Sequence, residues 1–398
     1  MSRPRRLLGA GVAAGVLGVL GFFFALAPVV GARMNRVNQA KGIPVSARAA
    51  ALHRSLLVAD LHNDLLLWDR DPVTMGWWGH TDVERLVEGN VAIEVFSTVT
   101  KTPKGQNYVR NSAASDNITL LALASRWPRR TWSSRQQRAL YEADKLEHAA
   151  AISEGRLVVV HTADELRKAL EFRAATPGIK PVIGLLNTEG LQALDGEIAN
   201  LDTVFVHGFR MAGLAHFFDN EVAGSAHGES KGGLTPLGRR VVARMQQLGM
   251  LVDLAHASPA AFDDVLAATN RPVVVSHTGV QATCAGPRNL TDAQLRALAA
   301  RGALIGIGFW DGAVCDISPH SIARAIRHAI DVAGVEHVAL GSDWDGATTV
   351  AFGANQVVQI TEALLQTGLS DAEIRAVMGE NVRRFLLENL PATHSVTP

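Results

Sequence analysis

The spacing of His62 and Asp64 suggests a pair of metal ligands. Both follow a short apolar run, residues 56–61, which has the composition of a buried strand. Side chains alternate along a strand, so residues two positions apart point to the same side and can bind one ion. Zinc accepts imidazole and carboxylate ligands, and manganese, cobalt and iron accept them as well. Because a histidine and an aspartate at this spacing also occur by chance, the pair needs support from elsewhere in the chain.

Further titratable residues stand at the ends of other apolar runs. This set comprises Glu189, His216, His256, His277 and Asp343. Each of them alone has an ordinary explanation, since a strand-end histidine is often hydrogen-bonded in a core and a glutamate can cap a helix. Burying all of them together costs several kcal/mol unless cations or protons compensate. A metal cluster is the simplest compensation, so we predict that these side chains converge.

Alternating strand-like and helix-like segments begin near residue 50 and predict the scaffold for this cluster. Short β-branched or aliphatic runs alternate with segments of helical periodicity, which is typical of βα units around a parallel sheet. Eight strands are expected, at residues 56–61, 91–98, 181–186, 209–215, 250–254, 272–276, 303–308 and 337–341, with 157–160 as a candidate for one more. We therefore predict an α/β fold, a (β/α)₈ barrel of the TIM type, whose catalytic residues follow the carboxyl ends of the strands. A doubly wound open sheet is the alternative, but the glycine fingerprint that usually follows its first strand is missing here.

Helix signals support this count of elements. Thr235 and the proline after it predict the start of a helix, and Gly249 predicts its end. Capping boxes are expected at Thr291 and at Ser370, each ahead of an apolar helical run. Residues 101–138 are the least regular, and we expect a long excursion of loop and helix there, with loops that can help to shape the pocket.

Longer motifs resemble those of the membrane dipeptidase family, also called renal dipeptidases or dehydropeptidases. In chain order they are HNDL at residues 62–65, GLTPLG at 233–238, LGMLVDLAH at 248–256, SH at 276–277, PRN at 287–289, GSDWDG at 341–346 and GENVRRF at 379–385. The similarity covers roughly residues 50–390 in the order of the family, and the combined motifs are highly specific. The family is a zinc-dependent branch of the amidohydrolase-like barrels.

The resemblance implies a pair of zinc ions, with manganese, cobalt or iron as alternatives. On that basis His62, Asp64 and Glu189 hold one ion. Glu189 then bridges to the other ion, which His256 and His277 also hold.

The resemblance also implies substrate-handling roles for His216, Arg288 and Asp343. A water that bridges the two ions would become a hydroxide and attack the scissile carbonyl. Asp343 would accept the proton of this water and pass it to the leaving amine, and His216 would stabilise the developing oxyanion. Arg288 would bind the terminal carboxylate of the substrate with both arms of its guanidinium group. The structural alternatives are a salt bridge for Arg288 and a hydrogen-bonded core position for His216.

These roles predict a dipeptidase that hydrolyses the single peptide bond of dipeptides, in a chain that forms a monomer or a homodimer. The alternative within the enzyme class is a related amidohydrolase that acts on N-acyl amino acids, lactones or β-lactams. The alternative from another class is a non-catalytic exported binding module that retains the barrel. The presence of all five ligands and of Asp343 argues against the binding module.

The N-terminus predicts a membrane anchor. Arg3, Arg5 and Arg6 precede an unbroken apolar stretch at residues 7–30, which is long enough to cross a bilayer. The apolar part of a cleavable signal is usually shorter, about 7–15 residues, and cleavage after Ala32 is the alternative. The basic cluster favours a cytoplasmic N-terminus, which places the catalytic part outside the cytoplasm, in the periplasm or the extracellular space.

We expect four segments along the chain. Residues 1–32 form the anchor or signal, 33–48 a linker, 49–391 the hydrolase barrel and 392–398 a tail. The formal net charge is zero, and no basic run is interleaved with aromatic residues, so nucleic acid is not an expected partner.

Two cysteines, Cys284 and Cys315, are too few for a disulfide scaffold or a zinc knot. In an exported protein they can form a single bridge, and they can equally be free thiols in the core. The resemblance to the membrane dipeptidases favours the disulfide.

Overall fold

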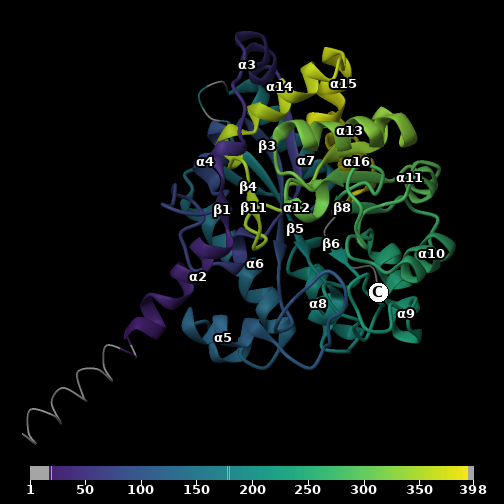
Figure 1. The fold of residues 1–398 in the computed structure, drawn as a ribbon. Helices are drawn as coiled ribbons and strands as arrows, with labels where there is room; N and C mark the ends of the chain where they lie inside the picture. Colours follow the sequence, from purple (N-terminus) through teal and green to yellow (C-terminus); the bar gives the residue numbers. More distant parts are fainter. Residues whose placement is uncertain (1–17, 19, 177, 179, 393–398) are drawn as a thin grey trace, which may run out of the picture.

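Eight parallel strands close into a barrel in the computed structural model, which describes residues 18, 20–176, 178 and 180–392 (Figure 1). In chain order these strands are β2 (Val58–Asn63), β3 (Val91–Thr98), β5 (Val182–Thr188), β6 (Phe209–Gly213), β7 (Leu251–Asp253), β8 (Val274–Thr278), β9 (Leu304–Ile307) and β10 (Val338–Leu340). Their order around the ring is β3-β2-β10-β9-β8-β7-β6-β5, and pairing of β3 with β5 closes it. The predicted (β/α)₈ barrel and its eight strands are confirmed.

A ninth strand lies outside the ring. This strand, β4 (Leu157–Val159), pairs in parallel with the first half of β5, where Leu157 faces Val182. The apolar run at residues 157–160 is therefore the additional strand that its composition suggested.

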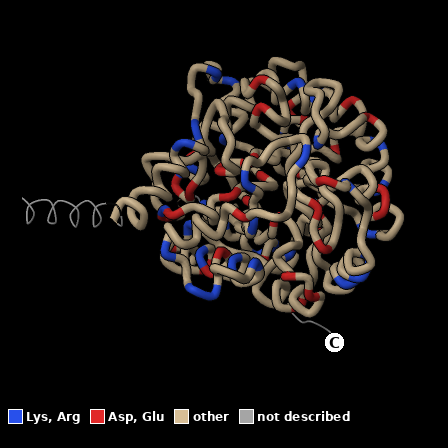
Figure 2. The backbone as a smooth tube through the Cα atoms, turned by 60° about the horizontal axis from the view of Figure 1, so that its bottom comes forward, with Lys and Arg blue, Asp and Glu red and all other residues tan. Residues whose placement is uncertain are grey.

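Helices surround the barrel (Figure 1). After β2 they are α4 (Val83–Glu88), α5 (Asn117–Ala124), α6 (Arg135–Ile152), α7 (Ala163–Ala175), α8 (Ala199–Val206), α9 (Pro236–Leu248), α10 (Pro259–Ala268), α11 (Asp292–Ala299), α12 (Asp311–Val314), α13 (Pro319–Ala333), α14 (Val358–Gln366), α15 (Asp371–Arg375) and α16 (Asn381–Asn389). In the view of Figure 2 the basic and acidic positions are interspersed along the chain.

The predicted helix ends are present. The Thr235 side chain accepts a hydrogen bond from Gly238 N at the start of α9, and Gly249 ends the helix with a left-handed φ of 72°. Thr291 and Ser370 both form capping boxes, at the starts of α11 and α15. These caps satisfy backbone N–H groups that the first turn of a helix leaves without partners.

One buried apolar cluster connects all eight barrel strands. It includes Ala59, Ile93, Ile183, Met211, Leu251, Val274, Leu304 and Ala339, one from each strand. Burial of such side chains stabilises the fold by about 1.5–3 kcal/mol for each larger one. This packing fixes the strands, and with them the loops at their carboxyl ends.

The segment before the barrel packs against it. It contains α2 (Leu26–Met34), β1 (Arg36–Val37) and α3 (Ala47–Arg54). Strand β1 pairs in parallel with β11 (Thr349–Val350), which follows the last barrel strand. Asn38 N also donates to Val350 O at 2.7 Å. Much of the stretch that we expected to be a linker, residues 33–48, therefore contacts the barrel domain.

Most of the predicted anchor, residues 1–32, lies outside the part of the chain that the structure describes, and so does nearly all of the predicted tail, 392–398. The described part of the N-terminal region includes α2, which has 9 residues. Among the described residues no helix is long and apolar enough to cross a membrane.

Gly341 offers a test of the barrel packing. A Cβ atom at this position would lie 2.0 Å from the carbonyl oxygen of Ser276, a backbone atom that cannot swing away. We expect Gly341→Ala to lower the free energy of unfolding by roughly 1–3 kcal/mol, measured by chemical denaturation.

Gly232→Ala is the matched control, because the nearest atom to its added Cβ is 3.7 Å away and its φ is not left-handed. Its stability should change by less than about 0.5 kcal/mol, as expected for a site with no steric conflict. Equal stability of the two variants would contradict the close strand packing at Ser276.

Candidate active site

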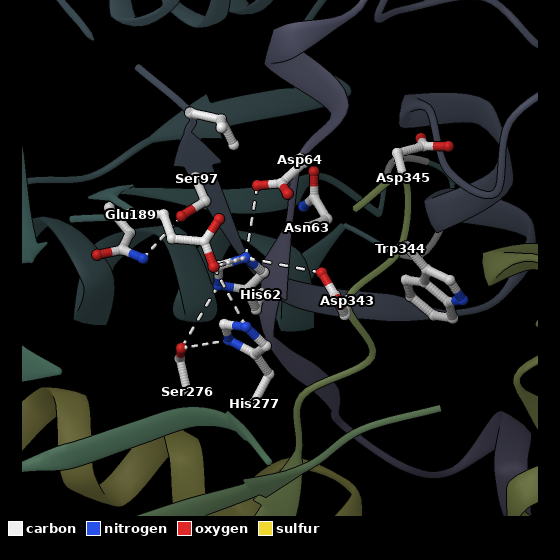
Figure 3. A network of polar contacts seen from close by, with 12 residues as sticks. His62, Asn63, Asp64, Ser97, Glu189, Ser276, His277, Asp343, Trp344 and Asp345 are labelled. Atoms are coloured by element: carbon white, nitrogen blue, oxygen red, sulfur yellow. Dashed lines mark hydrogen bonds and ion pairs between the residues drawn. The ribbon is translucent and has the colours of Figure 1, made fainter. Parts of the chain in front are cut away.

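The carboxyl ends of the barrel strands bring the predicted ligands together, and Figure 3 shows four of them, namely His62, Asp64, Glu189 and His277. His62 lies in β2 and Asp64 follows that strand directly, with 3.4 Å between Nε2 of His62 and Oδ1 of Asp64. Glu189 follows β5, and its Oε1 is 3.7 Å from the same Nε2. Asp343 lies beyond β10, and its Oδ1 is 3.9 Å from this nitrogen. One imidazole nitrogen therefore faces three carboxylates from three strand ends.

Glu189 is the point at which the histidines meet. Its Oε1 lies 3.0 Å from Nε2 of His256 and 3.3 Å from Nε2 of His277. Its Oε2 lies 3.2 Å from Nε2 of His216. The carboxylate thus contacts four imidazoles, including that of His62, and the structure brings together every metal ligand that the sequence predicted.

The donor set fits a metal centre. Nε2 of His62 and Oδ1 of Asp64 are buried and have no hydrogen-bond partner in the described part of the chain, although both are strong polar groups. Buried groups of this kind are rare unless an ion or water satisfies them. Imidazole nitrogen and carboxylate oxygen are the ligands that catalytic zinc sites use. The orphaned atoms and the chemistry of the set together match bound metal ions.

The geometry defines three overlapping groups of donor atoms, each within 4.8 Å of one another. They are His62 with Glu189 and His277, Glu189 with His216 and His256, and His62 with Asp64 and Asp343. The predicted division, with His62 and Asp64 on one side of Glu189 and His256 and His277 on the other, combines five of these seven residues differently. His216 and Asp343, which we predicted to handle substrate, also lie within ligand distance of the centre.

Burial and mutual charge perturb the titration of these groups. Burial lowers the pKa of His62, but the carboxylates of Glu189, Asp64 and Asp343 outweigh it and raise that pKa to about 10. Burial raises the pKa of Asp343 to about 8 and holds that of Glu189 well above its usual range. Burial also lowers the pKa of His216 to about 3. Cations would favour charged carboxylates and neutral imidazoles at the same time, and so relieve this conflict.

Two site residues have a backbone conformation that is uncommon for residues other than glycine. His256 has a φ of 61° and Asp343 a φ of 59°. Left-handed conformations of this kind cost free energy, and they persist where the surrounding structure enforces them, often at functional sites. Both residues lie in sharp turns after a barrel strand.

A serine and an aspartate behind the histidines were missed by the sequence analysis. Ser276 Oγ lies 2.9 Å from Nδ1 of His277 and 3.4 Å from Nδ1 of His62, and it donates to Asp253 at 2.5 Å. A partner on the second ring nitrogen orients a histidine that binds metal. Both residues lie inside motifs described above, the LGMLVDLAH stretch and the SH pair. Their position close to a predicted ligand in the sequence is the feature that could have identified them.

Arg288 lies at the edge of the centre. Its Nη2 is 3.1 Å from Nε2 of His256 and donates to the carbonyl of His277 at 3.1 Å. The guanidinium carbon lies 4.7 Å from the ring centre of Trp310. Nε of Arg288 has no hydrogen-bond partner in the described structure, so the guanidinium group retains a free donor.

These residues open onto a cavity of about 640 Å³. Its polar lining includes Asp64, Glu189, His216, His256, Arg288 and Asp343. Tyr108 and Trp310 also line it, and Trp310 Nε1 donates to the Tyr108 hydroxyl at 2.9 Å. Tyr108 belongs to the irregular region at residues 101–138, whose loops we expected to help shape the pocket.

The two cysteines form a disulfide, as the resemblance implied. Cys284 belongs to the loop that carries Arg288, and Cys315 follows α12, the short helix after Trp310. Asn289 reinforces this join, because its Nδ2 donates to Cys284 O at 2.8 Å and to Gly312 O at 3.1 Å. The bridge therefore connects the loops that bear Arg288 and Trp310.

The chain is similar to known dipeptidases. The family model "Membrane dipeptidase (Peptidase family M19)" matches residues 46–394. Dipeptidase tcpJ of Claviceps purpurea (strain 20.1) is 29% identical over 334 residues, which cover 82% of this chain and 73% of that protein. Dipeptidase verJ of Clonostachys rogersoniana is 27% identical over 361 residues, covering 85% of this chain and 86% of the relative.

Solved structures show the same fold. A metallo peptidase from Rhodobacter sphaeroides, liganded with a phosphinate mimic of the dipeptide L-Ala-D-Ala, superposes with a TM-score of 0.68 at 25% identity. The match covers 84% of this chain and 99% of that one. The probable dipeptidase PvdM from Pseudomonas aeruginosa gives a TM-score of 0.70 at 18% identity, over 87% of this chain and 98% of that one. At that identity the second match is evidence for the fold alone.

Glu189→Gln tests the central role of this carboxylate. The substitution keeps the size of the side chain but removes the charge that faces four imidazoles. We expect the metal content to fall, and hydrolytic activity to drop at least about 100-fold, as for other strong disturbances of a metal site. Metal is measured by mass spectrometry of the purified protein.

Glu197→Gln is the control, because Glu197 lies eight positions away along the chain and is exposed. It should leave both the metal content and the activity unchanged. Full metal occupancy and activity in the Glu189→Gln protein would contradict our assignment.

The disulfide should contribute to stability. It closes a loop with a sequence separation of 31 residues. Its removal in the double variant Cys284→Ser/Cys315→Ser should lower the free energy of unfolding by about 3–4 kcal/mol, because the unfolded chain gains conformational freedom. Chemical denaturation of both proteins measures the difference, and adding a reductant to the wild-type protein should reproduce it. A double variant of unchanged stability would contradict a structural role for the bridge.

Proposed function

The chain belongs to the membrane dipeptidase family of metal-dependent hydrolases, and we propose that it hydrolyses dipeptides with a pair of zinc ions. The observation that carries the proposal is the convergence of four histidines on Glu189 beside a buried arginine. Relatives that are named dipeptidases support the reaction class. A similar fold in a metallo peptidase liganded with a dipeptide mimic supports the substrate class.

The proposed ligands are those that the sequence suggested. His62, Asp64, Glu189, His256 and His277 would hold the ions, with Glu189 between them. When bound, the ions supply Lewis acidity, which makes water a better nucleophile near neutral pH and polarises the scissile carbonyl. Manganese, cobalt or iron would satisfy the same donors.

Protein groups around the cavity carry out the other parts of the reaction. Water adds to the carbonyl carbon, the C–N bond breaks, and a carboxylic acid and a free amine leave. Asp343, whose Oδ1 lies 3.9 Å from Nε2 of His62, can accept a proton from the attacking water and return it to the leaving nitrogen. His216, neutral because burial lowers its pKa, can donate a hydrogen bond to the developing oxyanion.

Arg288 is proposed to bind the substrate carboxylate. Its guanidinium group is buried at the cavity wall and keeps an unpartnered Nε donor. A planar guanidinium fork matches a carboxylate with two parallel hydrogen bonds. A carboxylate held this close to the reacting centre leaves room for a single residue on the amine side, which favours dipeptides over longer peptides.

We propose that the N-terminal segment predicted at residues 1–32 anchors the protein in a membrane through its part before α2, with residues 49–391 forming the catalytic domain outside the cytoplasm. The apolar stretch with arginines before it supports the anchor. The cleavage point considered earlier, Ala32, lies inside α2, where a cut would divide a helix that packs on the barrel. The disulfide is in keeping with an oxidising compartment. The homodimer remains a prediction.

Metal removal tests the proposed function. The full-length protein in detergent should hydrolyse dipeptides, and exhaustive chelation should lower the rate at least about 100-fold, because the water loses its activation. Added zinc should restore it, and a heat-denatured sample is the blank. Hydrolysis that continues in protein shown to be metal-free would overturn the proposal.

A further inference from the structure

The catalytic cavity has an apolar end that the proposed reaction does not use. Four residues of α2 line it, namely Leu26, Ala27, Val30 and Met34. They are one, three or four positions apart, so they form one face of the helix. Helix α5 adds four more apolar side chains to the same cavity, together with Asn117, whose Nδ2 donates to the carbonyl of Pro103. The helix at the end of the predicted anchor is therefore a wall of the catalytic site.

The apolar end lies across the mouth of the barrel from Arg288. Val99 follows β3 directly and packs in one buried cluster with Ile118 of α5. Arg288 lies in the loop after β8, which is four strands from β3 around the ring of eight in either direction. The proposed metal ligands therefore lie between the arginine and the apolar wall.

Helix α2 is fixed in this position by several contacts. Gly31 approaches the indole of Trp78 so closely that a Cβ on the glycine would lie 2.3 Å from a ring atom. Asn35 Oδ1 accepts a hydrogen bond from Ala347 N at 2.8 Å. Strand β1 follows immediately and pairs with β11. The wall is thus joined to the loop that carries Asp343.

The position of this wall has a chemical consequence. With the substrate carboxylate on Arg288, the group on the other side of the scissile bond extends toward α2 and α5. A wall of leucine, valine, methionine and alanine side chains gives no hydrogen bonds to a polar group, but it releases water when an apolar chain is buried against it. The cavity of about 640 Å³ falls within the range for much larger ligands than a dipeptide of small residues.

We infer that the preferred substrate carries a large apolar group on the acyl side of the bond that is cleaved, and that α2 binds this group. The inference depends on the proposed amide hydrolysis and adds its substrate class. Two kinds of compound share this chemistry, namely a dipeptide whose first residue has a long apolar side chain and an N-acyl amino acid.

The experiment measures the hydrolysis of two series of N-acylated glycines, each with a free carboxylate, by full-length, zinc-loaded protein in nanodiscs. One series is Xaa-Gly, with Xaa as alanine, 2-aminohexanoic, 2-aminooctanoic or 2-aminodecanoic acid. The other is acetyl-, hexanoyl-, octanoyl- and decanoyl-glycine. We expect kcat/KM to rise about threefold for each added methylene in at least one series, until the cavity is filled. The series that rises identifies which kind of compound the site takes.

Substitutions of two neighbouring valines distinguish a direct role of α2 in substrate binding from a general effect of an added charge. Val30 lines the cavity, whereas Val29 is 43% exposed and does not line it. Val30→Asp should reduce the preference for the longest over the shortest compound at least about 10-fold, because it places a carboxylate beside the apolar chain. Val29→Asp should retain the wild-type preference. Val30→Leu, which stays apolar, should retain a preference for long chains and shows that the position tolerates substitution.

The outcomes distinguish this inference from the proposed function. Cleavage of short compounds with no dependence on chain length would overturn the inference and leave the dipeptidase intact. An equal loss of preference in the Val29→Asp and Val30→Asp proteins would overturn the role of α2. Failure of the zinc-loaded protein to cleave any compound in either series would overturn the proposed function and the inference together.

Discussion

The contact of one buried carboxylate with four imidazoles is the constraint on which the site depends. Glu189 meets histidines from β2, β8 and the loops after β6 and β7, so four other strand ends must lie at fixed distances from it. Such a cluster is costly in a protein interior unless cations balance it. Closure of the barrel holds the strand ends in place, and the metal chemistry explains why so many titratable groups are buried there.

Residues behind the ligands also hold the site in place. Ser276 and Asp253 orient the histidine rings, and the disulfide holds the loop of Arg288 beside that of Trp310. Ser276, Asp253 and the two cysteines do not line the cavity themselves. Their effect is to limit how far the donor atoms can move, since misplacement by about 1 Å is enough to weaken catalysis strongly.

Much of the fold was predictable because its signals are local. Strand composition, helix caps and the order of βα units are encoded in neighbouring residues, and the ligands stand where strands end. Contacts between distant segments were not predictable in this way. The two-residue pairing of β1 with β11 and the wall formed by α2 depend on tertiary packing, and no local sequence pattern predicts them. The left-handed turn at His256 likewise overrides the preference of a residue that is not glycine.

The pairing of β1 with β11 also bears on how the domain is oriented. A flexible linker at this place would let the barrel rotate freely relative to α2. Here two paired residues and the hydrogen bond from Ala347 to Asn35 join the end of α2 to the rim of the barrel. The end of α2 and the barrel therefore form one unit, and the direction in which the cavity opens is fixed relative to the axis of that helix.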